Sequence, residues 1–266
     1  MKKIILLSFL FVGILQSCSD DDGTDKSKLI AGTMELTTQA QVDAFVASNY
    51  GSVAGDLTIG SRFFETDITD LSGLNRLTDV SGVLAIFGNS SLTSLEGLHK
   101  IKHVGSLEII GNSTIPDLKG LRSLEEVSDQ LGGAIYIQDN ASLKNLEGLE
   151  KLTEITSISL ENNASLENLK GLNNVTIFNL SFHIINCESL ISLEGLEKVT
   201  TFEGIFYLDG LQSLVSLQAL ESLSHLNSFS ISSCPALTSL DGFENITSLE
   251  GSIGLRNNLI LNSIEA

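Results

Sequence analysis

Apolar residues recur along most of this chain with a period of about 23 or 24 residues, from Leu57 to the C-terminus. Each unit has an apolar-x-apolar step, an asparagine three residues later, and then an apolar residue at about every third position. The second apolar residue of the step falls at Ile59, Ile86, Ile109, Ile137, Leu160, Ile184, Leu208, Ile231 and Leu255. Such a period predicts a solenoid, whose units must stack to bury their apolar faces.

The apolar-x-apolar step predicts a short strand with one buried face, and such a strand is stable only when it is stacked on others. The sequence therefore predicts a ladder of parallel strands. A second column, within a Leu-x-Gly-Leu step, holds Gly73, Gly97, Gly120, Gly148, Gly171, Gly195, Ala219 and Gly242. Glycine there predicts a tight corner or a close approach to the neighbouring coil, and Ala219 suggests that the corner tolerates a Cβ atom.

A third column predicts an inward ladder of amide side chains that bond to main-chain groups where each strand ends. Its members are Asn89, Asn112, Asn140, Asn163 and Asn258, with Cys187, Leu211 and Cys234 in the intervening coils. Cys187 and Cys234 invite a disulfide in an exported protein. They lie two coils apart, however, or about 9–10 Å at the strand spacing of about 4.8 Å. A disulfide needs Cα atoms within about 7 Å, so we predict two buried free thiols.

The N-terminal side of the solenoid carries a predicted capping helix within residues 34–51. Thr38 and Gln41 form a capping-box pattern, followed by an apolar stripe at helical spacing. Such a helix would cover the open end of the first coil. The ninth unit ends the chain without a polar cap. That end either frays or is covered by a partner or a second copy, and we expect fraying and a monomer.

Residues 1–17 combine Lys2 and Lys3 with an apolar run that is too short to span a bilayer, as in a secretory signal. Leu15-Gln16-Ser17-Cys18 resembles the lipobox of bacterial lipoproteins, which implies cleavage before Cys18 and lipidation of that residue. Residues 18–33 are predicted to be an acidic flexible tether. Ser19-Asp20-Asp21-Asp22 resembles the surface-export signal of some Gram-negative lipoproteins, and the alternative is a merely solvated linker. We expect an outer-membrane protein facing the exterior, with the leaflet left open.

Two insertions interrupt the period, one at residues 62–66 and the other at residues 128–132. Insertions in a solenoid form surface loops and often lie on the binding face. A tolerated loop without a role is an equal alternative.

The composition fits one long domain, because 42% of the 266 residues are hydrophobic and only two are proline. The formal net charge of −18 becomes −20 once the two lysines of the signal segment are removed. Such an acidic chain is not expected to bind nucleic acid or an anionic membrane surface. Its membrane contact would be the lipid on Cys18 alone.

The columns resemble the receptor L domain family, in the form seen in bacterial surface lipoproteins, over about residues 34–266. The resemblance rests on the run Gly55-Asp56-Leu57-Thr58-Ile59-Gly60 and on steps such as Leu95-Glu96-Gly97-Leu98. It implies a mainly β, right-handed parallel solenoid of about eight to nine units with little helix, and a role in extracellular recognition. Ordinary leucine-rich repeats place one residue between the asparagine and the next leucine, whereas two stand here.

Catalytic or metal-binding residues are scarce. His99 and His103 share one coil, but their spacing presents one face only on a helix and no third ligand is near, so no metal site and no cofactor is expected. The acidic residues Glu96, Glu147, Glu194 and Asp241 occupy variable positions and suggest a solvated face. We expect no enzymatic activity. A polysaccharide-active enzyme, which would need acidic groups gathered across coils, is the alternative.

The outward positions of the predicted strand offer a candidate binding face, because a solenoid builds such a face by stacking equivalent positions. Its aromatic and apolar members are Phe87, Ile110, Tyr136, His183, Ile185 and Tyr207. Together they would make the sheet more apolar than solubility requires, so we expect it to bind a protein or a glycan. Two alternatives remain: these residues serve only strand formation, or the protein is a structural component of the envelope.

Overall fold

The structure, a computed structural model, describes residues 28–130 and 132–262. Its elements in chain order are β1 (Lys28–Ala31), β2 (Met34–Leu36), α1 (Gln39–Ala47), β3 (Tyr50–Ala54), β4 (Leu57–Gly60), η1 (Ser72–Leu74), β5 (Asp79–Phe87), β6 (His103–Ile110), η2 (Lys119–Leu121), β7 (Glu126–Val127), β8 (Ile135–Gln138), β9 (Glu154–Glu161), β10 (Ile177–Ile185), β11 (Thr201–Asp209), η3 (Gln218–Leu220), β12 (His225–Ser232), β13 (Ser248–Leu249) and β14 (Ile253–Arg256).

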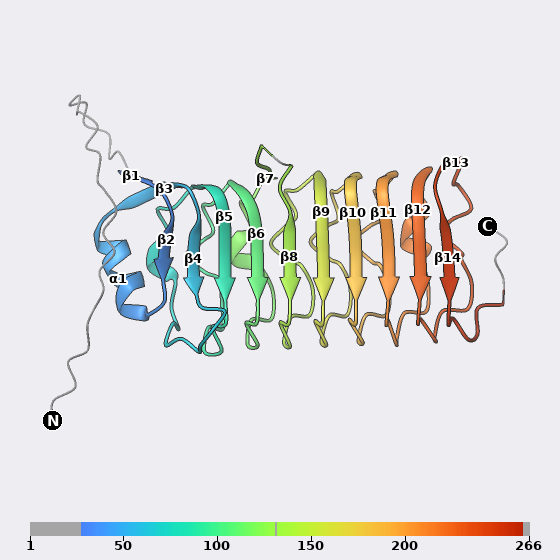
Figure 1. Ribbon diagram of the computed structural model, residues 1–266, viewed down its shortest axis with the longest axis horizontal. Coiled ribbons are helices and arrows are strands. Elements are labelled where there is room, and N and C mark those ends of the chain that lie inside the picture. The colour runs from blue at the N-terminus through green and yellow to red at the C-terminus, as the bar shows by residue number, and fades with distance from the viewer. Residues whose placement is uncertain (1–27, 131, 263–266) are drawn as a thin grey trace.

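The chain forms a straight parallel β-solenoid of about ten turns (Figure 1). The long side is a ladder of parallel strands in the order β2, β4, β5, β6, β8, β9, β10, β11, β12 and β14, which we call the front ladder. The register places Leu57, Leu84 and Leu107 side by side, as the repeat predicts. The predicted fold class is confirmed. The additional turn comes from β2, a strand within the segment predicted to be only a cap.

The N-terminal boundary differs from the prediction. Lys28–Ala31, placed in the flexible tether, forms β1 and pairs in parallel with β3. Strand pairing therefore begins within residues 18–33, and the tether prediction is wrong for this stretch. A short strand can join a sheet whose edge already offers unpaired main-chain groups, even where its composition is polar. The predicted signal segment and Cys18 lie outside the described residues.

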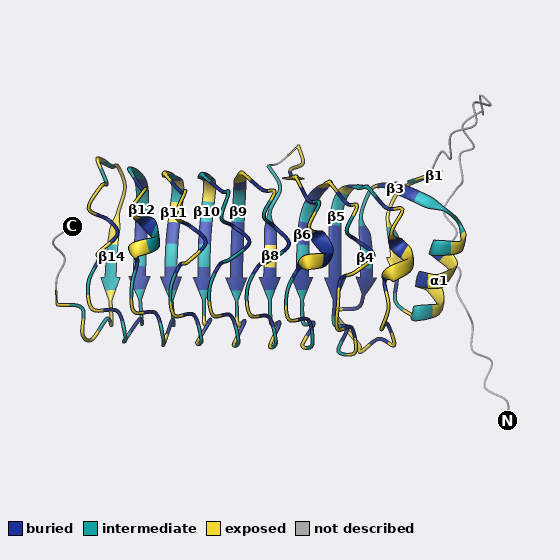
Figure 2. Cartoon of the chain, turned by 180° about the vertical axis from the view of Figure 1, so that it is seen from behind, coloured by how far each residue is buried: buried dark blue, intermediate teal, exposed yellow. Residues whose placement is uncertain are grey.

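The longer strands bend. The repeat predicted only a three-residue strand in each unit and did not predict this bend. In β5 the pairing with β6 shifts register between Val80 and Val83, so one strand serves two sides of the coil. Apolar residues on both sides of the bend, such as Val80 and Leu84, are fully buried. The short helices η1–η3 lie on the side opposite the front ladder (Figure 2). Each coil thus encloses a narrow apolar core.

The capping helix is confirmed. The Thr38 hydroxyl accepts a hydrogen bond from the Gln41 main-chain N–H at 3.3 Å, and the Thr38 N–H donates to Gln41 Oε1 at 3.1 Å. Val42 and Phe45 point into the core of the first coil and are buried. Among the described residues, no helix combines the length and apolar character needed to cross a bilayer.

The asparagine ladder is also confirmed. Asn112 donates from Nδ2 to the Ile86 carbonyl at 2.8 Å, and its Oδ1 accepts from the Asn89 N–H at 3.2 Å. Each buried amide therefore bridges two coils with both of its polar ends satisfied. Cys187 and Cys234 continue this column as free, buried thiols, as predicted. Burial raises the pKa of each thiol to about 11, so both stay protonated.

The glycine corner has two forms. Gly97, Gly148, Gly171, Gly195 and Gly242 adopt φ values between +113° and +120°. The coils of Gly73, Gly120 and Ala219 instead turn through η1, η2 and η3, and Ala219 is not among the residues with positive φ. Ala219 therefore marks a different turn. It does not show that the left-handed corner tolerates a Cβ atom.

Gly171→Ala should destabilise the fold by about 2–4 kcal/mol, because the Cβ atom would require a left-handed backbone and lie 1.9 Å from the Leu146 carbonyl oxygen. Urea unfolding measures the change in the free energy of unfolding. Ala219→Gly is the matched control and should cost less than about 1 kcal/mol. Equal effects of the two substitutions would contradict the assignment of two corner types.

Candidate functional site

The outward side of the front ladder brings only part of the predicted site together. His183 on β10 lies beside Tyr207 on β11, with ring centroids 5.5 Å apart in an edge-to-face arrangement. Tyr136 is exposed but stands two strands from His183, with Ser159 between them. The three side chains therefore share a column without forming a continuous cluster.

Phe87 is not part of an exposed face, contrary to the prediction. Only 7% of it is exposed, because the Arg62 guanidinium lies 4.1 Å from the centre of its ring. Arg62 also forms an ion pair with Glu108 on the next strand. Stacking of a cation on an aromatic face is favourable and removes the ring from solvent. The covering residue belongs to the insertion at residues 62–66, whose position the repeat does not define.

Two exposed apolar residues that the sequence analysis missed lie on the same strands as the His183–Tyr207 pair. Leu180 is 61% exposed at the bend of β10, and Ile205 is 51% exposed on β11. Ile185, a predicted site residue on β10, is half-buried, as is Ile110 on β6. We define the front patch as Leu180, His183, Ile185, Ile205 and Tyr207. The sequence does carry a signal for Leu180 and Ile205. Each is an apolar residue that follows a core phenylalanine, Phe178 or Phe202, by two or three positions and does not belong to the repeat pattern.

The front patch rests on a rigid aromatic core. Phe182 and Phe206 stack with a centroid distance of 5.4 Å and an interplanar angle of 3°. Phe178 and Phe202 stack in the same way at 5.0 Å, and edge contacts join the two pairs. All four rings are essentially buried. Stacked and edge-to-face pairs fix the relative position of neighbouring strands, so the outward side chains are held in a defined arrangement.

Two ionisable groups of the front patch have shifted pKa values. Burial lowers the pKa of His183, and the charge of Glu161 on β9 partly opposes this shift. Burial also raises the pKa of the Tyr207 phenol, with additional contributions from the charge of Asp209 and a hydrogen bond to it. Both side chains are therefore mainly neutral at pH 7. The patch offers rings and aliphatic groups at its centre, with the carboxylates of Glu161 and Asp209 beside it.

The first insertion forms a fixed loop at one end of strands β4 and β5. The Ser61 hydroxyl accepts a hydrogen bond from the Phe63 N–H at 3.1 Å. At the other end of the loop, the Thr66 hydroxyl donates to Asn89 Oδ1 at 2.6 Å, which ties the loop to the buried asparagine ladder. With Arg62 held over Phe87, two contacts fasten the loop to the next coil, and the bond from Phe63 to Ser61 fixes its turn.

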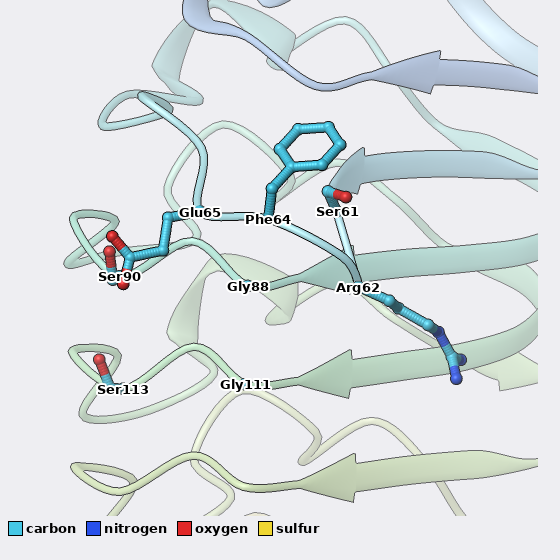
Figure 3. Close-up of a pocket in the computed structure, with 8 residues that line it drawn as sticks. All are labelled: Ser61, Arg62, Phe64, Glu65, Gly88, Ser90, Gly111 and Ser113. Atoms are coloured by element: carbon cyan, nitrogen blue, oxygen red, sulfur yellow. The ribbon is translucent and has the colours of Figure 1, made fainter.

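An open groove of about 370 Å³ lies between this loop and the turns of the next two coils (Figure 3). We call it the insertion groove. Its lining consists of Ser61, Arg62, Phe64, Glu65, Gly88, Ser90, Gly111 and Ser113. Figure 3 places Gly88 and Gly111 on adjacent coils directly after the strands, with Ser90 and Ser113 beyond them. The lining is mostly polar, and its two glycines expose main chain.

A second hollow of about 330 Å³ lies at the corners of later coils and includes three carboxylates. Glu194 forms an ion pair with Lys170 at 3.0 Å, and Glu197 accepts a hydrogen bond from the Gly195 N–H at 2.9 Å. Two of the three acidic groups thus serve the structure of the corner. Among the described residues, no group of three or more His, Cys, Asp or Glu side chains could hold a metal ion.

Comparison with known families matches residues 51–147 to the receptor L domain. This stretch runs from β3 past β8 and includes the insertion groove. No curated protein matches the chain. The match and the β-solenoid fold agree, and the matched family is one of receptor-like, ligand-binding domains. Domains of this family are generally without enzymatic activity.

His183 should titrate below the ordinary histidine pKa of about 6.5. Because burial disfavours the protonated ring, the unfolded chain binds this proton more tightly than the folded chain does. The contribution of His183 to stability is therefore present above pH 6.5 and is lost as the pH falls through its folded-state pKa. NMR titration of the imidazole signals measures the midpoint, and His183→Gln should reduce the loss of stability between pH 7 and pH 5. A midpoint at or above 6.5 would contradict this cause.

Proposed function

We propose that this protein is a non-enzymatic recognition or adhesion protein that is anchored to the outer membrane by a lipid on Cys18 and faces the cell exterior. Its front patch binds another protein. The single observation that carries this proposal is the exposure of Leu180 and Ile205 on the two strands that hold the His183–Tyr207 pair, over a rigid aromatic core.

The shape and chemistry of the front patch favour a protein over a small ligand. A sheet surface without a deep pocket suits a broad partner surface, whereas small ligands need concave sites that enclose most of their area. Aliphatic and aromatic groups with a polar surround are typical of the centre of a protein interface. Because the strands are fixed by their pairing and by the phenylalanine stack, little order is lost on binding, which favours affinity.

The arrangement of the acidic residues supports a role without catalysis. Glu96, Glu147 and Glu194 form ion pairs with Arg122, Lys119 and Lys170 of neighbouring coils. Such exposed pairs solvate the surface and hold the coils in register. A glycan hydrolase would need two carboxyl groups facing each other across a substrate cleft, one of them with a raised pKa. The second hollow instead uses Glu194 and Glu197 in structural contacts.

Lipid anchoring rests on the sequence of the leader. A basic start, an apolar stretch and a small residue directly before Cys18 occur together. The acidic run that follows supports export to the surface. The net charge of −20 without the leader disfavours contact with an anionic bilayer, so a covalent lipid would provide the membrane attachment.

Cys18→Ser should abolish lipidation when the full gene is expressed in a Gram-negative host. Mass spectrometry of the N-terminal peptide should show a diacylglyceryl group on Cys18 in the unsubstituted protein, and fractionation should recover that protein with outer membranes. Cys234→Ser is the control, because this buried thiol is far along the chain and should leave the lipid unaffected. An unmodified Cys18 thiol in the membrane fraction would contradict the anchor.

The triple substitution Leu180→Ser, Ile205→Ser and Tyr207→Ala should weaken protein binding at least tenfold, because it removes the apolar centre of the front patch. The measurement is binding of the full chain to an array of secreted and cell-surface proteins, followed by titration of each protein retained.

The matched control is Ile191→Ser with Val215→Ser on the opposite side of the coils. These residues are 52% and 49% exposed, close to the 61% of Leu180 and the 51% of Ile205, so the control matches the two aliphatic substitutions of the triple variant. The control should bind as the unsubstituted chain does. Equal losses in both variants, or binding unaffected by the triple substitution, would contradict recognition through the front patch.

A further inference from the structure

Three outward residues of neighbouring strands lie in one row across the front patch. The register of the parallel strands pairs Ile185 on β10 with Glu161 on β9 and with Asp209 on β11. Neighbouring strands are about 4.8 Å apart, so the two carboxylates stand about 10 Å apart with the isoleucine between them. Two residues earlier in β10 and β11 are His183 and Tyr207, whose rings are in contact. A negative charge therefore lies on each side of the apolar row that Ile185 begins.

No lysine or arginine neutralises either of these carboxylates. Glu161 accepts a hydrogen bond from the Ser159 hydroxyl at 2.7 Å, and Asp209 is hydrogen-bonded to the Tyr207 phenol. In the described part of the chain, neither carboxylate forms an ion pair. The nearest basic residue of this row is Arg256 on β14, two strands beyond Asp209. Both negative charges are therefore held in place by neutral neighbours and remain open to a partner.

Charge is distributed unevenly around the coils. The sequences of β9, β10, β11 and β12 contain no lysine or arginine, and their acidic residues are Glu154, Glu161, Glu203 and Asp209. Of these, Glu203 has a histidine partner, since its carboxylate lies 3.5 Å from His225. At the corners, by contrast, acidic residues are paired with lysines of neighbouring coils, as Glu147 is with Lys119. The surface around the front patch therefore keeps a negative charge that the corners do not.

These charges disfavour several partners that an apolar patch could otherwise take. A second copy of this chain, docked through the same patch, would place its own Glu161 and Asp209 against the first pair. Like charges that face each other across an interface repel and weaken the complex. An acidic protein, or the anionic surface of a membrane, is disfavoured for the same reason. The remaining partner for an apolar centre with free carboxylates beside it is a protein of opposite charge.

We propose that the partner of the front patch is a protein with a basic surface. An apolar side chain of this partner packs against Ile185 and Tyr207. Lysine or arginine residues on either side of it pair with Glu161 and Asp209. This inference rests on the proposed binding of a protein by the front patch, and it adds the chemistry of that protein. The apolar contact supplies most of the affinity, whereas the opposite charges speed the encounter and fix the orientation of the two surfaces.

The test begins with an array of secreted and cell-surface proteins probed with the full chain. Front-patch ligands are the proteins that the unsubstituted chain retains and that the triple substitution Leu180→Ser, Ile205→Ser and Tyr207→Ala loses. These ligands should be basic at pH 7. Their association rate constants should fall at least tenfold between about 0.05 M and 0.5 M NaCl, because salt screens the attraction between opposite charges.

Glu161→Gln with Asp209→Asn should lower the association rate constant of each front-patch ligand by about fivefold or more at low salt, and the effect should vanish at high salt. Both side chains are at the surface, so the melting temperature should stay within a few degrees. Glu161→Gln alone should lower the rate constant about twofold or more, and it provides a second variant if the double substitution does not fold.

The matched control is Glu167→Gln with Glu221→Gln, which removes the same net charge from two exposed positions outside the front ladder and should leave the rate constant nearly unchanged. An equal loss in the control would overturn the proposal, because the total charge of the chain would then set the rate. Acidic front-patch ligands, or rate constants that the double substitution leaves unchanged at low salt, would overturn the basic partner alone and leave recognition through the patch intact. An array without any front-patch ligand would overturn both proposals.

Discussion

The close, in-register stacking of successive coils is the constraint on which the rest of this structure depends. At the corner, the coils approach so closely that a Cβ atom on Gly148 would lie 1.9 Å from the Leu118 carbonyl oxygen. Inside, each ladder asparagine satisfies polar groups of two coils at once, so a shift by one residue would leave buried amides without partners. Because every coil must repeat the position of its neighbour, outward residues also form columns. The chemistry of a surface therefore depends on which residue each coil places in a given column.

Most of the fold could be predicted from the sequence, because the period reports directly on this stacking. The inward columns and the free thiols at Cys187 and Cys234 follow from it, whereas the capping helix was predicted from the local pattern of Thr38 and Gln41. The candidate site was predicted less well. Leu180 lies at a bend, where the alternation of inward and outward positions is broken. Phe87 is covered by Arg62 from a loop that interrupts the period, so no column shows the contact.

The front patch and the insertion groove use the solenoid in different ways. The front patch depends on equivalent positions of β10 and β11, and its shape is set by the phenylalanine rings beneath the sheet. The insertion groove instead depends on a departure from the repeat. The loop at residues 62–66 lies beside two coils in which a glycine, Gly88 or Gly111, follows the strand. Between β5 and β11 there are five strand spacings, or about 24 Å, so each surface can be altered without disturbing the other.

The asparagine ladder also divides the solenoid into two parts in which different side chains fill the same inward column. Amide-to-amide contacts run from Asn89 to Asn163, and beyond them Cys187, Leu211 and Cys234 occupy the same column with weaker hydrogen-bonding groups or none. In a quasi-one-dimensional fold, such a change creates a point at which cooperative opening can stop. Beyond Asn163, main-chain pairing and the stacked phenylalanine rings of β10 and β11 hold the coils in register, so the front patch lies where aromatic packing takes the place of the amide contacts.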